Sequence, residues 1–189
     1  RYTEADLPEA APRQQLFAVG RECMARAGFI EVGMDQYAQP RDGLVQALQP
    51  RTLHRNFMRL SANPTHALLG LGVAAIGAGS DTYAQNEKSL QQYEARVKAQ
   101  QLPLQRGHVL SQADLGVRKL LWALFTRSRA LPTAADRAAP WWPAAHAALC
   151  RLELDGLTTV SGESVTVTEL GRAFLRQVGV ALDQHLRQN

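Results

Sequence analysis

The chain has 189 residues, of which 46% are hydrophobic and 20% charged, and its formal net charge is +4. This composition is typical of a soluble globular protein and excludes a disordered chain. The longest apolar run, residues 67–78, is interrupted by glycines and is too short to span a bilayer. The two cysteines, Cys23 and Cys150, are too few for a disulfide scaffold and too far apart for a short-spaced metal motif. We therefore expect a cytoplasmic protein with two buried thiols.

The N-terminal residues predict a helix followed directly by a strand. Pro12 suits a helix start and Gly28 a helix stop. Residues 29–34 suit a β-strand, which indicates a helix-to-strand unit of an α/β fold. Residues 35–37 follow the strand's C-terminal end, where such folds usually place ligands. The apolar positions at helical spacing in the first segment are Leu16, Val19, Cys23 and Met24.

Three further segments follow before residue 102. Residues 41–58 are predicted to be largely helical, with an interruption near Pro50. Residues 67–78 are apolar nearly throughout, as expected for a segment buried on both faces. Residues 86–101 are predicted to form an amphipathic surface helix with Leu90, Tyr93 and Val97 as its apolar seam.

A change of composition at residues 102–104 is predicted to divide the chain into two domains, 1–102 and 103–189. The second domain is expected to be a helical, winged-helix-like module with a small hairpin. Its predicted elements are a helix starting with the capping box of Ser111 and Asp114, a loop over 130–143, a helix from Pro143 to Leu154, a hairpin at 157–167 and a last helix capped by Thr168.

One glycine-rich stretch, Gly70 to Ala75, fits the pattern G-x-G-x-x-A of dinucleotide-binding loops. The context argues against that function, because only a short apolar stub precedes the glycines and Asp81 comes too early for the expected acidic residue. We therefore interpret these glycines as allowing the backbone to approach a ligand or a neighbouring element closely.

Four motifs occur in order along the first half of the chain. They are Gly33-Met34-Asp35-Gln36-Tyr37-Ala38, Leu53-His54-Arg55-Asn56-Phe57, Gly70-Leu71-Gly72-Val73-Ala74-Ala75-Ile76 and Ala84-Gln85-Asn86-Glu87-Lys88. Together with the Asp-Gly-Leu hairpin start at 155–157 and the T-x-x-G-R helix start at 168–172, they resemble the oxygen-independent coproporphyrinogen III oxidases of the radical S-adenosylmethionine class. The sequence departs from that pattern at Gln36, where His is common, and at Met58 and Leu60, where several relatives have Gln and Tyr.

The resemblance implies an α+β, mostly helical fold. Residues 1–38 would be the end of a partial (β/α) barrel, with residues 40–100 packed under its cofactor end and the helical domain following. The cluster-binding Cys-x-x-x-Cys-x-x-Cys motif is expected in an N-terminal half and does not occur in this chain. The resemblance thus identifies the chain with the C-terminal portion of such an enzyme, and on its own we expect it to be inactive.

The chemistry that the resemblance implies is oxidative decarboxylation of two propionates of coproporphyrinogen III to vinyl groups, giving protoporphyrinogen IX in haem biosynthesis. A reduced [4Fe–4S] cluster would cleave S-adenosylmethionine, and the deoxyadenosyl radical would abstract hydrogen from a propionate side chain. The implied partners are coproporphyrinogen III, the enzyme's own N-terminal domain and an electron donor, with no membrane.

Two residues map onto contacts to S-adenosylmethionine expected from the family, Phe57 and Ile76. An aromatic face and a branched aliphatic side chain could enclose an adenosyl group, although ordinary core packing would use the same residue types. His54, Arg55 and Asn56 are candidates for positioning the substrate, because they are hydrogen-bond donors beside an aromatic residue. No catalytic residue and no metal ligand is expected in this chain.

Two alternatives remain open at this point. The same architecture could serve a haem-handling or scaffold protein. A winged-helix outline and a basic chain also suggest a nucleic-acid-binding module, but the helix at 143–154 offers only one Arg and one His to bases, and Glu153 and Asp155 would oppose phosphates. The composition therefore disfavours nucleic acid as a partner.

Overall fold

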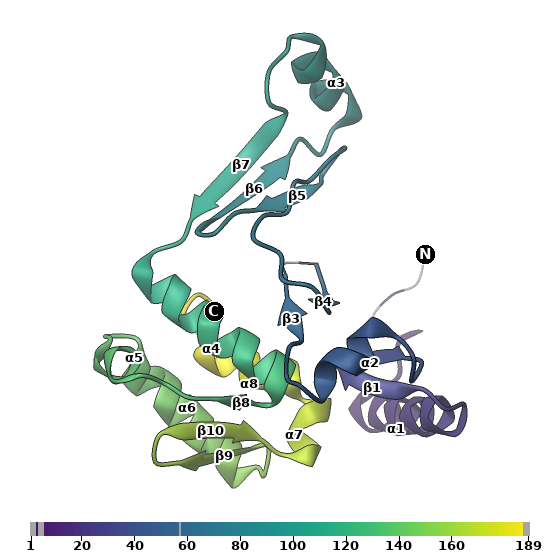
Figure 1. The fold of residues 1–189 in the computed structure, drawn as a ribbon, viewed down its shortest axis with the longest axis vertical. Coiled ribbons are helices and arrows are strands. Elements are labelled where there is room, and N and C mark those ends of the chain that lie inside the picture. Colours follow the sequence, from purple (N-terminus) through teal and green to yellow (C-terminus); the bar gives the residue numbers. More distant parts are fainter. Residues whose placement is uncertain (1–2, 4–5, 57, 187–189) are drawn as a thin grey trace.

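The computed structural model describes residues 3, 6–56 and 58–186. The chain forms an N-terminal part, a projecting arm and a C-terminal part (Figure 1). The N-terminal part comprises α1 (Ala10–Arg26), β1 (Ile30–Gly33), β2 (Gln36–Ala38), α2 (Gly43–Leu48), β3 (His54–Arg55) and β4 (Leu60–Ser61). The arm comprises β5 (Ile76–Ala78), β6 (Thr82–Asn86), α3 (Leu90–Lys98) and β7 (Leu104–Val109). The C-terminal part comprises α4 (Gln112–Arg127), β8 (Arg129–Ala130), α5 (Ala134–Ala138), α6 (Trp142–Leu154), β9 (Thr158–Ser161), β10 (Ser164–Val167), α7 (Glu169–Ala173) and α8 (Leu175–Leu182).

The predicted helix and strand at the N-terminus are confirmed as α1 and β1. Gly28 ends α1 with φ of 80°, and the amide of Phe29 donates to the Met24 carbonyl, as in a Schellman cap. The helical spacing was right, but the apolar face is not covered, since Leu16 and Val19 are 62% and 54% exposed. None of the helices in the described residues is long and apolar enough to cross a membrane.

β1 turns back directly into β2, and the two strands form an antiparallel hairpin. Residues 35–37, which were expected only to follow the C-terminal end of the strand, lie in this hairpin. Met34 and Asp35 form the turn with φ of 51° and 62°, and Glu31 pairs with Tyr37. Positive φ at both central residues is the geometry of a type I′ hairpin turn. Over the part of the chain that is described, no closed barrel forms, and the partial-barrel assignment of residues 1–38 stays a prediction.

Two of the predicted segments are wrong. Only Gly43–Leu48 of residues 41–58 is helical, because the chain leaves α2 through Arg51 in the left-handed region and then forms strands. Residues 67–78 are not buried on both faces, since Leu69 and Leu71 are 81% and 80% exposed. Their glycines shape a loop rather than a core strand, so apolar composition alone was misleading.

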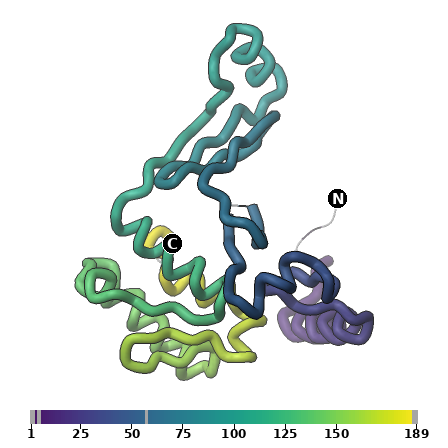
Figure 2. Tube along the Cα trace, viewed as in Figure 1, coloured from purple at the N-terminus to yellow at the C-terminus, as the bar shows by residue number. Residues whose placement is uncertain are grey.

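The arm is an antiparallel sheet in the order β5-β6-β7 with α3 at its far end (Figure 1). Figure 2 shows the chain running out along the arm and returning through β7 into α4. α3 is the predicted surface helix, but its seam is open, because Leu90 and Val97 are 56% and 48% exposed. β7 pairs with β6 across the proposed division at residue 102, and that division stays a prediction.

The C-terminal part contains the larger hydrophobic core, in which Leu120, Leu124, Leu149 and Val178 are almost completely buried. The capping box of Ser111 and Asp114 is confirmed, as is the β9–β10 hairpin. The predicted loop over 130–143 contains the short helix α5, and the third strand β8 was not foreseen. The last helix is divided at Phe174 into α7 and α8. The winged-helix description of this part stays a prediction.

The Asp-Gly-Leu and T-x-x-G-R motifs meet at one contact in the C-terminal part. The Thr168 hydroxyl donates to the Gly156 carbonyl at 2.6 Å and accepts from the Gly171 amide at 2.9 Å. A Cβ on Gly171 would overlap the Leu157 carbonyl and lie 2.9 Å from Val167 Cγ1. Glycine is therefore required at position 171 because the hairpin backbone passes too close for a side chain.

Gly171→Ala is expected to lower the free energy of unfolding by about 2–3 kcal/mol, because the added methyl must displace backbone atoms. Urea unfolding of the chain, followed by tryptophan fluorescence, measures this. The neighbouring Leu170 is 56% exposed, and Leu170→Ala should change stability by less than about 0.5 kcal/mol. Equal effects of the two substitutions would contradict the packing argument.

Candidate functional site

The glycine-rich run is a loop at the base of the arm. Leu68 exchanges two backbone hydrogen bonds of 2.8 Å with Ala78, and the Ala74 amide donates to the Glu87 carbonyl at 2.8 Å. A strand, β5, follows the loop where a dinucleotide-binding loop would open a helix. The structure thus agrees with the rejection of dinucleotide binding. Gly70 is needed for a close approach, since a Cβ there would lie 2.7 Å from the Ile76 carbonyl carbon.

Asn86 links the glycine run to the A-Q-N-x-K motif. Its side chain is buried, and Nδ2 donates to the carbonyls of Gly70 and Gly72 at 3.1 and 2.9 Å. Its backbone amide donates to the Ala75 carbonyl at 2.9 Å. A single buried amide therefore holds both glycines of the run against β6, which places the two motifs in contact.

Of the two residues assigned to S-adenosylmethionine, only Ile76 can be placed. It is half-buried at the start of β5 and pairs with Gln85 of β6. The close approach of Gly70 and the bonds of Asn86 fix the backbone on both sides of it. Phe57 lies outside the described residues, so its predicted proximity to Ile76 stays a prediction.

His54, Arg55 and Asn56 begin the short β3–β4 hairpin. Asn56 Oδ1 accepts from the amides of Met58 and Arg59, each at 2.9 Å, so its side chain holds the connecting turn. Asn56, a candidate for positioning the substrate, therefore has a structural role in this turn. Leu60 of β4 is 1% exposed in the smaller core.

Arg55 joins three segments of the chain. Its Nη1 donates to Met34 Sδ at 2.9 Å, and its guanidinium lies 5.1 Å from the centroid of the Phe125 ring on α4. Burial lowers the pKa of Arg55, although a guanidinium stays charged in proteins. The contact brings the first two motifs together and attaches them to α4, so Arg55 positions segments as well as carrying charge.

His54 and Arg55 also line a cleft between β3 and α4 with a volume of about 700 Å³. Asn56 lines a small adjoining cavity, and Ile76 belongs to neither lining. The sequence analysis did not identify several of the cleft's other basic residues, among them Arg118, Arg127 and Arg129. The row of cationic side chains along and just beyond the helix at 112–127 could have indicated them, but it belongs to none of the motifs.

Metal ligands are not assembled in the part of the chain that is described. It contains no group of three or more His, Cys, Asp or Glu side chains that could hold a metal ion. The expectation of two buried thiols is wrong, because Cys23 is exposed and Cys150 is only half-buried beside His146, with Sγ 3.8 Å from Nδ1. The described residues therefore do not fit an iron–sulfur cluster.

Comparison with known proteins gives a consistent set of relatives, although no protein-family model matches the chain. The oxygen-independent coproporphyrinogen III oxidases of Salmonella typhimurium and Escherichia coli are each 32% identical over 193 residues, covering 100% of this chain and 42% of each relative. That of Synechocystis is 28% identical, covering 99% of this chain and 42% of the relative. The chain thus spans about two-fifths of the length of the curated relatives it matches.

The fold is similar to a solved structure, the coproporphyrinogen III oxidase of Escherichia coli, which is described as a radical SAM enzyme. The two superpose with a TM-score of 0.86 at 30% identity, over 97% of this chain and 44% of that one. The matched region is the C-terminal portion of these relatives.

Asn86→Asp is expected to loosen the glycine loop, because a carboxylate cannot donate to the two carbonyls that the amide serves. Loss of two hydrogen bonds at about 1 kcal/mol each should accelerate amide exchange in residues 70–76 by about tenfold or more. Hydrogen–deuterium exchange with mass spectrometry measures this. Asn63→Asp, at an exposed position, is the matched control, and identical exchange in both variants would contradict the role assigned to Asn86.

Proposed function

Because the chain is homologous over its whole length to the C-terminal portion of the oxygen-independent coproporphyrinogen III oxidases, we propose that it forms the substrate- and cofactor-covering part of such an oxidoreductase. The proposed reaction converts two propionates of coproporphyrinogen III to vinyl groups, with loss of carbon dioxide, a hydrogen atom and an electron from each. The observation that carries the proposal is the match in both sequence and fold, which covers 100% and 97% of this chain, respectively.

Bound S-adenosylmethionine would supply the hydrogen-abstracting radical in the whole enzyme. This chain would contribute apolar contact to the adenosyl group through Ile76 and Phe57 and exclude water from it. Ligands for an iron–sulfur cluster are not among the described residues. On this proposal the chain alone is inactive, and its N-terminal partner domain supplies the cluster.

The construction of the arm supports a positioning role for Ile76. Its neighbours in the loop and on β6 are fixed by buried or backbone hydrogen bonds, whereas the side chain itself is only half-buried. A firmly held backbone that presents an incompletely covered aliphatic group suits contact with a ligand. If Ile76 served ordinary core packing, its side chain would be buried further. The described residues of the arm contain no buried apolar side chain that would form such a core.

Nucleic-acid binding finds no support in α6, the helix that would enter a groove. Ala145, Ala148 and Leu149 of this helix are buried in the C-terminal core. The exposed large apolar side chain of the helix is Leu154, at 88%, and an apolar side chain does not neutralise phosphates. A haem-handling relative remains the alternative, and titration of the full-length gene product with haem and with S-adenosylmethionine separates it from the oxidase.

In the full-length gene product, Ile76→Ala is expected to uncouple cofactor cleavage from decarboxylation, because the adenosyl group would lose a lateral contact. The yield of vinyl product per 5′-deoxyadenosine formed should fall by about tenfold, corresponding to about 1.4 kcal/mol of lost positioning. Phe57→Ala should act in the same direction. Chromatography of both products in anaerobic turnover measures the ratio.

Val97→Ala, on the exposed face of α3 at the far end of the arm, is the control and should keep the parental ratio. A parental ratio in Ile76→Ala would remove Ile76 from the cofactor contact. A gene product without the three-cysteine motif and without iron–sulfur absorbance would overturn the proposed function itself.

A further inference from the structure

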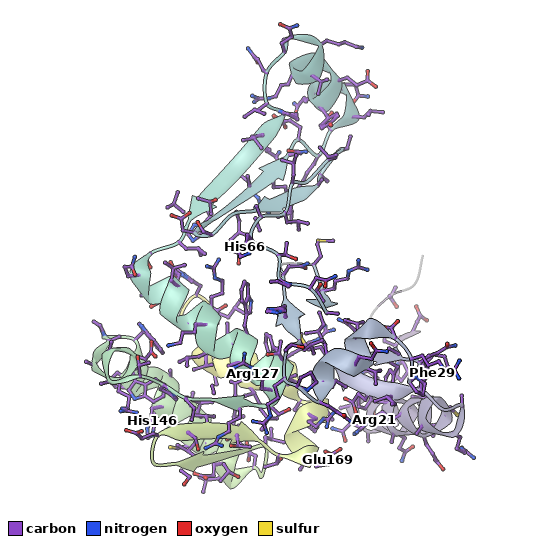
Figure 3. All side chains as sticks on the ribbon, in the orientation of Figure 1. Arg21, Phe29, His66, Arg127, His146 and Glu169 are labelled. Atoms are coloured by element: carbon purple, nitrogen blue, oxygen red, sulfur yellow. The ribbon has the colours of Figure 1, made fainter. Side chains whose placement is uncertain are left out.

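The cleft between β3 and α4 is strongly cationic. Its walls come from β3, the segment at 64–66, α4 and the residues just after α4. Figure 3 labels His66, on the segment below the arm, and Arg127, at the C-terminal end of α4. The basic side chains that line the cleft are Arg51, His54, Arg55, His66, Arg118, Lys119, Arg127 and Arg129.

No carboxylate lines the cleft within the described residues, and few of its cations are neutralised. Lys119 pairs with Asp136 at 3.5 Å. Arg55 is engaged by Met34 and Phe125, and Arg118 donates to the Ser80 carbonyl and lies over Trp122.

Among the guanidiniums that line the cleft, Arg51, Arg127 and Arg129 have no ion pair, side-chain hydrogen bond or aromatic contact within the described part of the chain. Like charges gathered in a cleft with low-dielectric walls raise the local concentration of anions. Folding holds these charges together against their mutual repulsion, which favours an anionic ligand as the reason for their arrangement.

The remaining residues that line the cleft indicate a ligand that is also partly apolar. Leu53, Leu115, Leu120, Trp122 and Leu131 share the walls with the cations. A small inorganic anion would use the guanidiniums but none of this apolar surface, whereas an amphipathic ligand with several carboxylates would use both. A volume of about 700 Å³ is within the range of clefts that enclose part of a drug-sized or larger molecule.

We propose that this cleft binds the propionate-bearing edge of a tetrapyrrole, with Arg127 and Arg129 pairing with its carboxylates and Trp122 and the leucines contacting its hydrocarbon part. The inference rests on the proposed function for the identity of the ring, and it assigns the substrate's anionic groups to a site separate from Ile76. Guanidiniums can pair with carboxylates through two parallel hydrogen bonds, which gives orientation as well as affinity.

The test uses the chain itself with coproporphyrin III, the air-stable oxidised ring that keeps all the propionates of the substrate. Binding is followed by porphyrin fluorescence at low and high ionic strength. Arg127→Glu combined with Arg129→Glu should weaken binding by about a hundredfold, since two charge-assisted contacts become repulsions. The tetramethyl ester of the same porphyrin should bind weakly and show no dependence on these residues or on salt.

The matched control combines Arg41→Glu with Arg151→Glu, two exposed arginines outside the cleft, and produces the same change in net charge. It should leave binding within about twofold of the parent, since distant exposed charges are screened by salt. Circular dichroism and thermal unfolding of both double variants confirm that each is folded before binding is compared.

Equal weakening by the control pair would reduce the effect to general charge and overturn the proposal. Tight binding of the ester would do the same. Displacement of the porphyrin by a random DNA duplex, lost with Arg127 and Arg129, would reassign the cleft to nucleic acid. The measurement needs neither S-adenosylmethionine nor a cluster, so a failure to bind porphyrin in the cleft does not contradict the proposed oxidase function. Conversely, a gene product without the cluster motif would contradict the oxidase function but not porphyrin binding in the cleft.

Discussion

The half-buried guanidinium of Arg55 is the contact on which the relative placement of the N-terminal and C-terminal parts most depends. Its hydrogen bond to Met34 Sδ and its position over Phe125 bring the β1–β2 turn, β3 and α4 to one point. A charge placed there without a carboxylate is destabilising unless other contacts compensate, and the aromatic ring and the sulfur acceptor provide them. A lysine could not replace it, because one ammonium cannot span both contacts in this geometry.

A second junction reinforces the first at the other side of the N-terminal part. Arg21 of α1 lies 3.0 Å from Glu31 of β1 and 3.1 Å from Glu169 of α7, and Arg172 lies 3.4 Å from the same Glu31. Figure 3 shows Arg21 and Glu169 close together. Glu31 is the least exposed member; it accepts a hydrogen bond from Arg21 and forms an ion pair with Arg172, in a site that salt screens only in part. The first junction joins β3 to α4, the two walls of the basic cleft, and the second joins α1 and β1 to α7.

The features that could be predicted from the sequence are those in which the decisive contacts are local. The caps at Ser111 and Thr168 and the stop at Gly28 involve residues within a few positions, so the patterns were sufficient. The strands of the arm depend on pairings such as Thr82 with Val109, which no local pattern specifies. His54 and Arg55 were found through motifs, but Arg127 and Arg129 approach them only in the folded chain, because more than seventy positions separate the walls of the cleft.

The arm differs from the rest of the molecule in what stabilises it. Among its described residues only Asn86 and Glu87 are buried, and Glu87 is paired with Arg96 at 2.8 Å. Its cohesion thus comes from sheet hydrogen bonds and polar contacts, while both apolar clusters lie outside it. Polar cohesion exposes little hydrocarbon on melting, so the arm adds little to the heat capacity of unfolding. A calorimetric trace of this chain would therefore report mainly the unfolding of the two apolar clusters and little of the segment that carries Ile76.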